Sequence, residues 1–225
     1  MKILRKILKN LPSTYLIALK KIYYKRQISS GNFISTEAEF DFISRLIKPG
    51  DKVVDIGANI GHYTLKLSEL VGRNGRVIAF EPVPETFDML SSNVGSFPTK
   101  NVTLINGALS PIVEETKFST PDGNLYQSHM DASGDIGVMA FPLKSFIPDN
   151  WPLAFIKIDA EGCDQVIIES SLGTIEKLRP IIMAEINREV SELLKENLSE
   201  YSIVNLGGSH NTFLVPNENL NLFDA

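Results

Sequence analysis

Apolar residues recur along the chain in two alternating patterns, short runs rich in β-branched residues and longer stretches with helical spacing. The short runs are typical of parallel strands buried on both faces, and the longer stretches are typical of the helices that cover such strands. Two later runs predict an antiparallel pair that closes the sheet. We therefore expect an α/β fold with a mostly parallel sheet, helices on both faces and an antiparallel closing strand. The expected strands are residues 53–56, 76–81, 102–106, 153–158, 180–184, 201–206 and 212–215, and the expected helices are residues 65–71, 84–94, 166–171 and 189–196.

The first 30 residues differ from the rest and are expected to form an extension ahead of a single domain at residues 31–225. Apolar residues within 3–11 lie on one helical face opposite basic residues, which predicts an amphipathic helix that Pro12 ends. A second apolar stretch and a second basic cluster follow. This pattern suits peripheral contact with an anionic membrane through residues 1–26, and packing against the domain or a partner subunit is the alternative.

Two further segments are expected to border a ligand site. Thr36 and Glu39 fit a capping box at the start of a helix that Pro49 ends, directly upstream of the first strand. Residues 111–145 contain two short strand-like runs separated by Gly, Asp, Ser and Asn, which predicts a hairpin-like insertion. Because it follows the third strand, we expect this insertion to contact the substrate.

Charge divides the chain at the same place as the apolar pattern. The net charge of −5 conceals eight basic residues and no acid in residues 1–36, against 14 basic and 27 acidic side chains in the remainder. An acidic body repels phosphate backbones, so we expect no nucleic-acid partner. No apolar run approaches the roughly 18 residues that span a bilayer, and the single Cys163 forms no internal disulfide. A soluble protein in the reducing cytoplasm is therefore expected.

The first strand runs into a glycine turn that is typical of a nucleotide-binding unit. Asp55 ends the strand, and Gly57 and Gly61 allow the backbone to turn sharply and to approach a ligand closely. The dehydrogenase fingerprint has a glycine where this chain has Asn59, so a dinucleotide is not the expected ligand. An aspartate ahead of the turn instead suits a cationic group, such as the ammonium of an amino-acid tail.

Two more strand ends complete the predicted cofactor site. Glu81 lies 24 positions after Gly57, which is close to the spacing at which a carboxylate meets a ribose in such units. Gly107 and Ala108 form the turn after the third strand and are expected near a base. An ammonium, a ribose diol and an adenine are all present in S-adenosylmethionine, which we therefore expect as the cofactor.

A carboxylate-rich turn follows the fourth strand and is the expected catalytic element. Asp159 lies where a general base or a substrate-orienting carboxylate is needed, and Glu161 is the second candidate. A plain helix-entry motif with acids near the helix dipole is the alternative for this turn. Glu185 and Asn187 end the fifth strand and, with Asp159, are a hypothetical set of oxygen ligands for Mg²⁺.

Taken together, these motifs resemble the FkbM family of S-adenosylmethionine-dependent methyltransferases. The resemblance covers about residues 36–216 and is carried by Gly-Ala-Asn-x-Gly, Phe-Glu-Pro, Lys-x-Asp-x-Glu-Gly and Arg-Pro-Ile-Ile-Met-Ala-Glu-Ile, in that order. It implies a class I methyltransferase (Rossmann-like) sheet and O-methylation of a hydroxyl on a sugar, a glycan or another small natural product. The chain departs from the family at Cys163-Asp164 and Leu143-Lys144, which concerns the acceptor rather than the cofactor. An N-methyltransferase and a non-catalytic module that docks through its basic leader are the alternatives.

Overall fold

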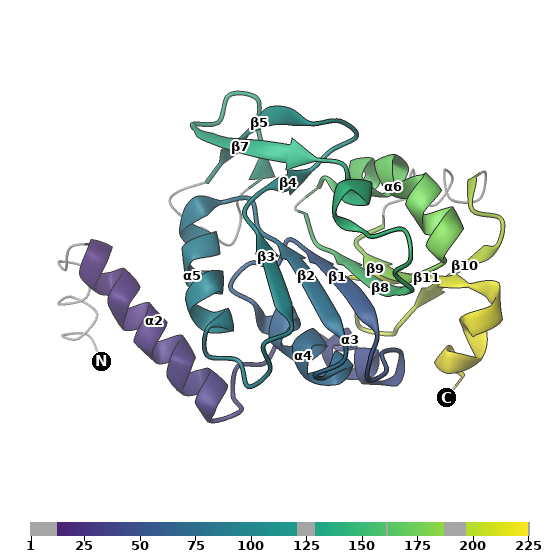
Figure 1. The fold of residues 1–225 in the computed structure, drawn as a ribbon, viewed down its shortest axis with the longest axis horizontal. Coiled ribbons are helices and arrows are strands. Elements are labelled where there is room, and N and C mark those ends of the chain that lie inside the picture. Colours follow the sequence, from purple (N-terminus) through teal and green to yellow (C-terminus); the bar gives the residue numbers. More distant parts are fainter. Residues whose placement is uncertain (1–12, 121–128, 161, 187–196, 225) are drawn as a thin grey trace.

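A computed structural model describes residues 13–120, 129–160, 162–186 and 197–224. Its centre is a seven-stranded sheet with the order β10-β11-β9-β8-β1-β2-β3 (Figure 1). The strands from β3 to β9 in that order pair in parallel, whereas β11 and β10 are antiparallel. The predicted α/β architecture, including its antiparallel closing pair, is confirmed. The strands are β1 (Lys52–Ile56), β2 (Arg76–Phe80), β3 (Val102–Ile105), β8 (Leu153–Ile158), β9 (Ile181–Ala184), β10 (Tyr201–Asn205) and β11 (Thr212–Pro216).

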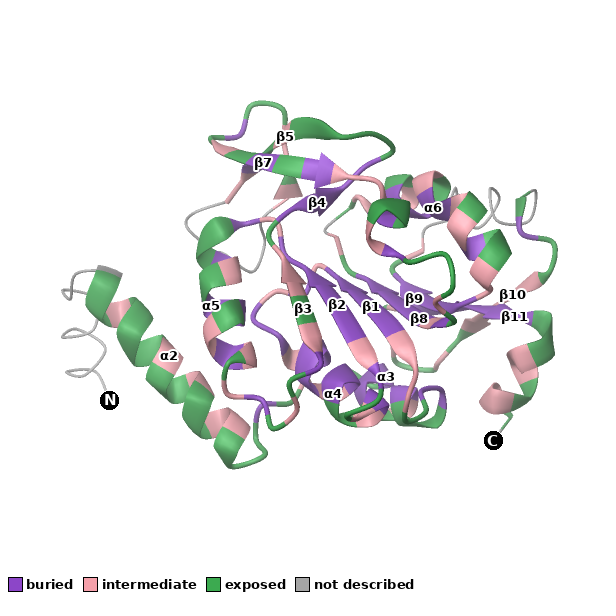
Figure 2. Ribbon diagram, in the orientation of Figure 1, coloured by how far each residue is buried: buried purple, intermediate pink, exposed green. Residues whose placement is uncertain are grey.

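Helices cover both faces of this sheet, and strand β1 shows why both covers are needed. Successive side chains of a strand point to opposite faces. Val53 packs with Leu67 of α4 (His62–Val71), whereas Val54 packs in the cluster that contains Ile168 of α6 (Asp164–Leu178). All four of these side chains are fully buried, and Figure 2 shows the central strands as the most buried part of the molecule.

The parallel register brings three strand ends to one edge of the sheet. Asp55 of β1 lies opposite Ala79 of β2 on one side and Lys157 of β8 on the other. The segments that follow these strands therefore emerge side by side at the carboxyl edge. Open parallel sheets bind their ligands at this edge.

A second, four-stranded sheet with the order β4-β7-β5-β6 covers part of that edge. The hairpin-like insertion predicted for residues 111–145 is present as the antiparallel pair of β5 and β7. The expected turn at Ala108 is wrong, because Ala108 and Leu109 pair with Ala140 and Phe141 of β7. The strands of this sheet are β4 (Ala108–Leu109), β5 (Glu114–Ser119), β6 (His129–Met130) and β7 (Ile136–Phe141).

Most helix predictions hold, with two differences. The helix predicted at residues 84–94 is α5 (Pro84–Val94), whereas α6 begins two residues before the predicted 166–171 and ends seven residues after it. The capping box is wrong: Ala38 is the N-cap residue of α3 (Glu39–Phe42), and no side chain caps this helix. Glu39 is instead buried and accepts a hydrogen bond from the Asn211 amide. The short 3₁₀ helices are η1 (Ile43–Arg45), η4 (Leu143–Phe146) and η5 (Asn217–Phe223).

Helix α2 (Ser13–Ser29) lies along α5 at the side of the domain (Figure 1). Its inner face packs through Tyr24 and Ile28 onto the cluster that contains Phe33, and Lys21 forms an ion pair of 2.6 Å with Asp88 of α5. None of the described helices combines the length and the apolar character that crossing a membrane requires. The helices predicted at 3–11 and 189–196 lie outside the described residues, and the boundary at residue 30 stays a prediction.

Candidate active site

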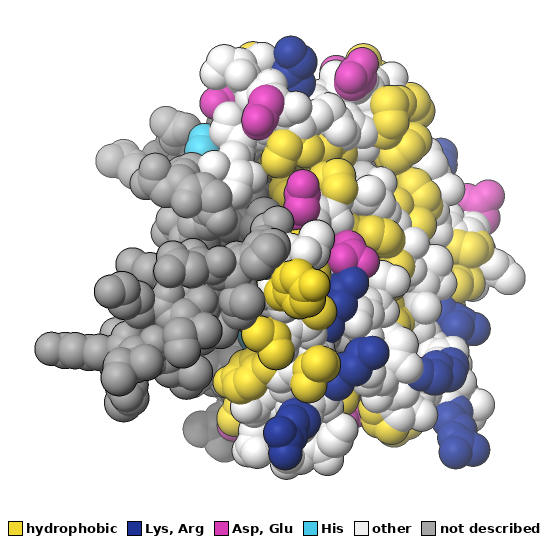
Figure 3. Space-filling model, turned by 90° about the vertical axis from the view of Figure 1, so that its left-hand side faces the viewer, with side chains coloured by type: hydrophobic (Ala, Val, Ile, Leu, Met, Phe, Trp, Pro, Cys, Tyr) yellow, Lys and Arg dark blue, Asp and Glu magenta, His cyan; other side chains and the backbone are white. Residues whose placement is uncertain are grey.

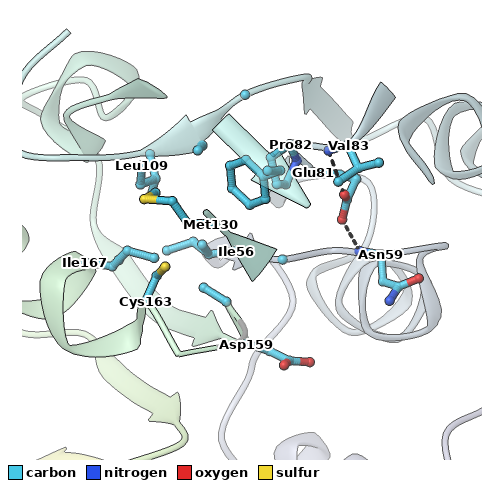
Figure 4. A pocket seen from close by; sticks show the side chains of 15 residues that line it. Ile56, Asn59, Glu81, Pro82, Val83, Leu109, Met130, Asp159, Cys163 and Ile167 are labelled. Atoms are coloured by element: carbon cyan, nitrogen blue, oxygen red, sulfur yellow. Dashed lines mark hydrogen bonds between the residues drawn. The ribbon is translucent and has the colours of Figure 1, made fainter. Parts of the chain in front are cut away.

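A cleft opens at the carboxyl edge of the sheet and is lined by the segments that follow four strands. These segments contribute Gly57 and Asn59 after β1, Glu81 after β2, Gly107 and Ala108 after β3, and Asp159 after β8. The second sheet adds Phe118 and Met130, which close the cleft from above. Figure 4 shows the Glu81 carboxylate at one end, apolar side chains at the other and Asp159 at the lower rim. Six of the nine predicted site residues thus line a single cleft.

The turn after β1 depends on the absence of a side chain at Gly57. Its φ is +70°, and a Cβ placed there would lie 1.9 Å from the carbonyl oxygen of Asp159. Gly61, with φ +100°, begins α4 and packs against Leu90, so it shapes the helix entry and does not line the cleft. Asn59 has φ +50°, a left-handed conformation that asparagine tolerates better than most residues. The turn after β1 therefore packs directly against the backbone that follows β8.

Glu81 is held in the cleft wall by two backbone amides. Asn59 N donates to its Oε2 at 2.9 Å and Val83 N donates to its Oε1 at 3.0 Å (Figure 4). Glu81 is 6% exposed, and this burial raises its pKa to about 7 although both amide hydrogen bonds oppose the shift. The side chain is thus a fixed acceptor whose charge is lost within the neutral pH range.

Asp55 lies behind the turn and not on the cleft surface. Its carboxylate is fully buried, and Oδ2 accepts a hydrogen bond of 2.6 Å from the Thr64 hydroxyl. Burial raises its pKa, although the neighbouring Lys157 and the Thr64 hydrogen bond oppose the shift. The predicted contact between Asp55 and a ligand ammonium is not part of this geometry, because Asp55 is outside the residues that line the cleft.

Lys157 is the important residue that sequence reasoning missed. Its ammonium lies 3.1 Å from Asp159 Oδ2 and 3.7 Å from Asp55 Oδ1, and it faces the ring of Tyr63 at 5.0 Å. Burial alone lowers the pKa of a lysine, but the two carboxylates outweigh it and raise the pKa of Lys157. The signal in the sequence is a lone cation inside the apolar run 153–158, where a charge is rare unless it is paired.

The other end of the cleft is apolar and lies under the second sheet. Gly107 and Ala108 reach it as predicted, and Gly107 is closely packed, since a Cβ there would lie 3.0 Å from the carbonyl oxygen of Met139. Cys163 also lines this end, and burial raises the pKa of its thiol. An apolar slot with one packed glycine wall suits a flat ring such as a base.

A second hollow begins on the other side of Asp159. It is lined by Glu37 and Glu39 near α3, by Glu185 after β9 and by the loop with His210. Glu37 accepts a hydrogen bond of 2.6 Å from the Tyr63 hydroxyl. Burial and repulsion from neighbouring carboxylates, Asp159 first among them, raise the pKa of Glu185. The hollow is therefore strongly acidic.

Two predicted candidates at this edge cannot be placed. Glu161 and Asn187 lie outside the described residues. Asp159 and Glu185 do line the same hollow, but within the described ranges no three His, Cys, Asp or Glu side chains converge as metal ligands. The proposed Mg²⁺ set of Asp159, Glu185 and Asn187 thus stays a hypothesis.

Comparison with known proteins adds a family and a fold. The family described as "Methyltransferase FkbM domain" matches residues 55–203, which is more than half of the chain. The crystal structure of methyltransferase FkbM from Methylobacillus flagellatus KT resembles this structure with a TM-score of 0.54 and 15% sequence identity. The similar region covers 73% of this chain and 43% of that chain, and at such identity it establishes the fold alone.

Curated relatives are matched over shorter regions. The protein-L-isoaspartate O-methyltransferase of Methanococcus aeolicus is 38% identical over 61 residues, which are 27% of this chain and 28% of that protein. The enzyme of the same name from Fervidobacterium nodosum is 26% identical over 137 residues, 58% of this chain and 67% of that protein. The chain thus spans less than a third of the first of these relatives.

Proposed function

The chain belongs to the FkbM family of S-adenosylmethionine-dependent methyltransferases, and we propose that it methylates a hydroxyl on a sugar, a glycan or another small natural product. The fold is consistent with this, because its central sheet has the class I methyltransferase (Rossmann-like) arrangement. The nature of the acceptor is inferred below from the charges and contacts around Asp159.

The residues that line the cleft between the strand ends suit S-adenosylmethionine in their chemistry. Glu81 offers fixed carboxylate oxygens for ribose hydroxyls, and the apolar slot beside Ala108 suits the adenine. Asn59 supplies a buried Oδ1 that has no hydrogen-bond partner within the described residues, and such an atom gains from a polar ligand. When bound, the cofactor supplies an electrophilic methyl group on a sulfonium.

The observation that carries the proposal is that Asp159 lines both the cleft and the acidic hollow. Lys157 binds Asp159 Oδ2, whereas Oδ1 makes no hydrogen bond within the described residues. Oδ1 is therefore available to accept the proton of a hydroxyl that enters from the hollow. A group that both orients the acceptor and takes its proton accelerates the transfer by proximity and by general base catalysis.

The charges in the hollow favour a neutral acceptor over an acidic one. Glu37, Glu39, Asp159 and Glu185 all line it, and its described lining contains no lysine or arginine. The buried Lys157 pairs with Asp159 from behind. A carboxylate acceptor entering this hollow would meet like charges in a partly buried site, which costs free energy. A hydroxyl carries no charge and can donate its hydrogen bond to Asp159.

The test uses the full chain with a methyl-¹³C cofactor and three acceptor pools, namely neutral sugars and polyols, amines, and isoaspartyl peptides. We expect label in the first pool as a base-stable methyl ether. Transfer confined to the amine pool, or a methyl ester that mild base removes, contradicts the O-methylation of a hydroxyl. Calorimetry that detects no S-adenosylmethionine binding overturns the cofactor assignment as well.

A further inference from the structure

Helix α2 carries apolar residues on two opposite faces, and the domain covers only one of them. The inner face packs through Tyr24 and Ile28. On the outer face, Tyr15, Leu19, Ile22 and Tyr23 are 63%, 47%, 58% and 56% exposed. These four residues have the spacing of one stripe along a helix. Such a stripe on a helix that already packs inward needs an explanation outside the domain.

Basic residues border this outer stripe. Lys20 and Lys25 lie on opposite flanks of it by helical geometry, and Arg26 lies at its end. All three are exposed, and α2 contains no acidic residue. Figure 3, which faces this side of the molecule, shows hydrophobic side chains gathered on the surface with Lys and Arg side chains beside them.

From this combination we propose that the outer face of α2, defined by Tyr15, Leu19, Ile22 and Tyr23 with Lys20, Lys25 and Arg26, binds an anionic lipid membrane. Tyrosine rings are amphipathic and favour the membrane interface, where they pack among lipids and keep their hydroxyls in contact with water. Lysine and arginine extend from the flanks to anionic headgroups. The stripe is thus suited to insert at the surface of a bilayer without spanning it.

Charge also decides between a membrane and a second copy of the chain. A two-fold dimer through this face would place the cations of both copies in one interface, to which α2 contributes no acidic residue. Like charges in an interface oppose association. An anionic surface instead pairs with every one of these cations.

The charge of the rest of the chain determines which side of the protein faces an anionic membrane. Residues 37–225 carry 14 basic and 27 acidic side chains, so an anionic membrane repels the body while it attracts α2. Helix α2 also borders a pocket that it shares with α5 and Asn59, and Asn59 lines the cofactor cleft as well. Binding through α2 would therefore hold the cleft close to the lipid surface.

The test measures co-flotation of the full chain with vesicles of phosphatidylcholine alone and of phosphatidylcholine with phosphatidylglycerol. We expect binding to the anionic vesicles only, weakened by high salt. The triple variant Lys20→Glu/Lys25→Glu/Arg26→Glu should bind at least about a hundredfold more weakly, because each lost cation costs about fivefold and each added carboxylate is repelled by the anionic surface. The variant Leu19→Gln/Ile22→Gln/Tyr23→Ser should also lose binding.

Matched controls lie elsewhere on the described surface. Lys48→Glu/Arg73→Glu/Lys144→Glu makes the same charge change at exposed sites, and Ile112→Gln/Val113→Gln removes two side chains that are 61% exposed. Both controls should float like the wild type. Equal binding to neutral vesicles, or unchanged binding by the two α2 variants, overturns the proposal.

Analytical sedimentation distinguishes membrane binding from the alternative, a dimer formed through α2. If the wild-type chain is a dimer and Leu19→Gln/Ile22→Gln/Tyr23→Ser is a monomer, α2 is an interface between copies and the membrane proposal is wrong. Flotation needs neither a cofactor nor an acceptor, so its outcome is independent of the proposed methyl transfer.

Discussion

The backbones of Gly57 and Asp159 approach so closely that a methyl side chain at position 57 would clash with Asp159. A Cβ at Gly57 would lie 1.9 Å from the Asp159 carbonyl oxygen, and the φ of Gly57 is +70°. The neighbouring backbone is bonded across the same gap, because Asp159 N donates to Ile56 O at 3.1 Å. This contact fixes the distance between the cofactor turn and the candidate catalytic carboxylate.

Replacing Gly57 with alanine should therefore destabilise the fold and open the cleft. We expect Gly57→Ala to lower the free energy of unfolding by roughly 3 kcal/mol or more, since backbone strain and a steric clash add. Gly50→Ala is the matched control, because Gly50 has φ +98° but a Cβ placed there would meet no atom within 4 Å. The control should lose only about 1 to 2 kcal/mol in denaturant unfolding. If Gly57→Ala and Gly50→Ala lose equal free energy of unfolding, the backbone has moved to relieve the clash and the prediction is wrong.

Protonation of Glu81 should weaken cofactor binding at mildly acidic pH. Burial raises the pKa of Glu81 to about 7 in the free protein, and its ionised oxygens accept hydrogen bonds from ribose hydroxyls more strongly than the protonated acid does. Cofactor affinity should therefore be highest well above pH 7 and should fall as the pH drops through 7, by at most about tenfold per pH unit. Calorimetric titrations between pH 8 and 5.5 check this.

The variant Glu81→Gln is the control for that pH profile. It should bind the cofactor weakly at every pH and show a flat profile over the same range. A wild-type affinity that does not change between pH 8 and 5.5 contradicts the role assigned to Glu81.

Local sequence patterns were sufficient to predict the sheet, because each parallel strand carries its own apolar run and glycines follow β1, β3 and β8. They also placed Gly57, Asn59, Glu81 and Asp159, since parallel strands that alternate with helices bring their carboxyl ends to one edge. These residues could be assigned to the cleft without knowing any long-range contact.

The predictions that were wrong concern residues whose roles depend on distant partners. Glu39 has the spacing of a capping box, but its carboxylate is bonded to Asn211, which is 172 positions away. Ala108 looks like part of a turn until β7 pairs with it. The cofactor contact expected of Asp55 stays a prediction, and in the structure Thr64 and Lys157 hold its carboxylate in the interior. Tertiary contacts decide these cases and local patterns do not.

Removing the buried cation at Lys157 should cost much more than removing an exposed one. Lys157→Met leaves the fully buried Asp55 without its charge partner, and breaking such a pair costs about 3 to 5 kcal/mol. Lys157→Met/Asp55→Asn should recover most of the loss, because both charges are then absent. Lys177→Met breaks an exposed pair with Asp149 and should cost less than about 1 kcal/mol. Chemical unfolding at pH 7 compares the three variants, and a double variant no more stable than Lys157→Met contradicts the pairing.

Asp159→Asn should separate catalysis from cofactor binding. The Asp159 side chain is 47% exposed, so its amide analogue fits without a buried charge being stranded, and Lys157 keeps Asp55 as a partner. An amide takes no proton from a hydroxyl, so single-turnover methyl transfer should fall about 10²- to 10⁴-fold, while the calorimetric dissociation constant for S-adenosylmethionine changes little. Cys163→Ser, which alters another residue of the same cleft, should retain the rate because no proton transfer is assigned to the thiol. If Asp159→Asn keeps the wild-type transfer rate, Asp159 is not the general base. If the variant loses cofactor affinity as much as it loses rate, Asp159 acts in cofactor binding alone.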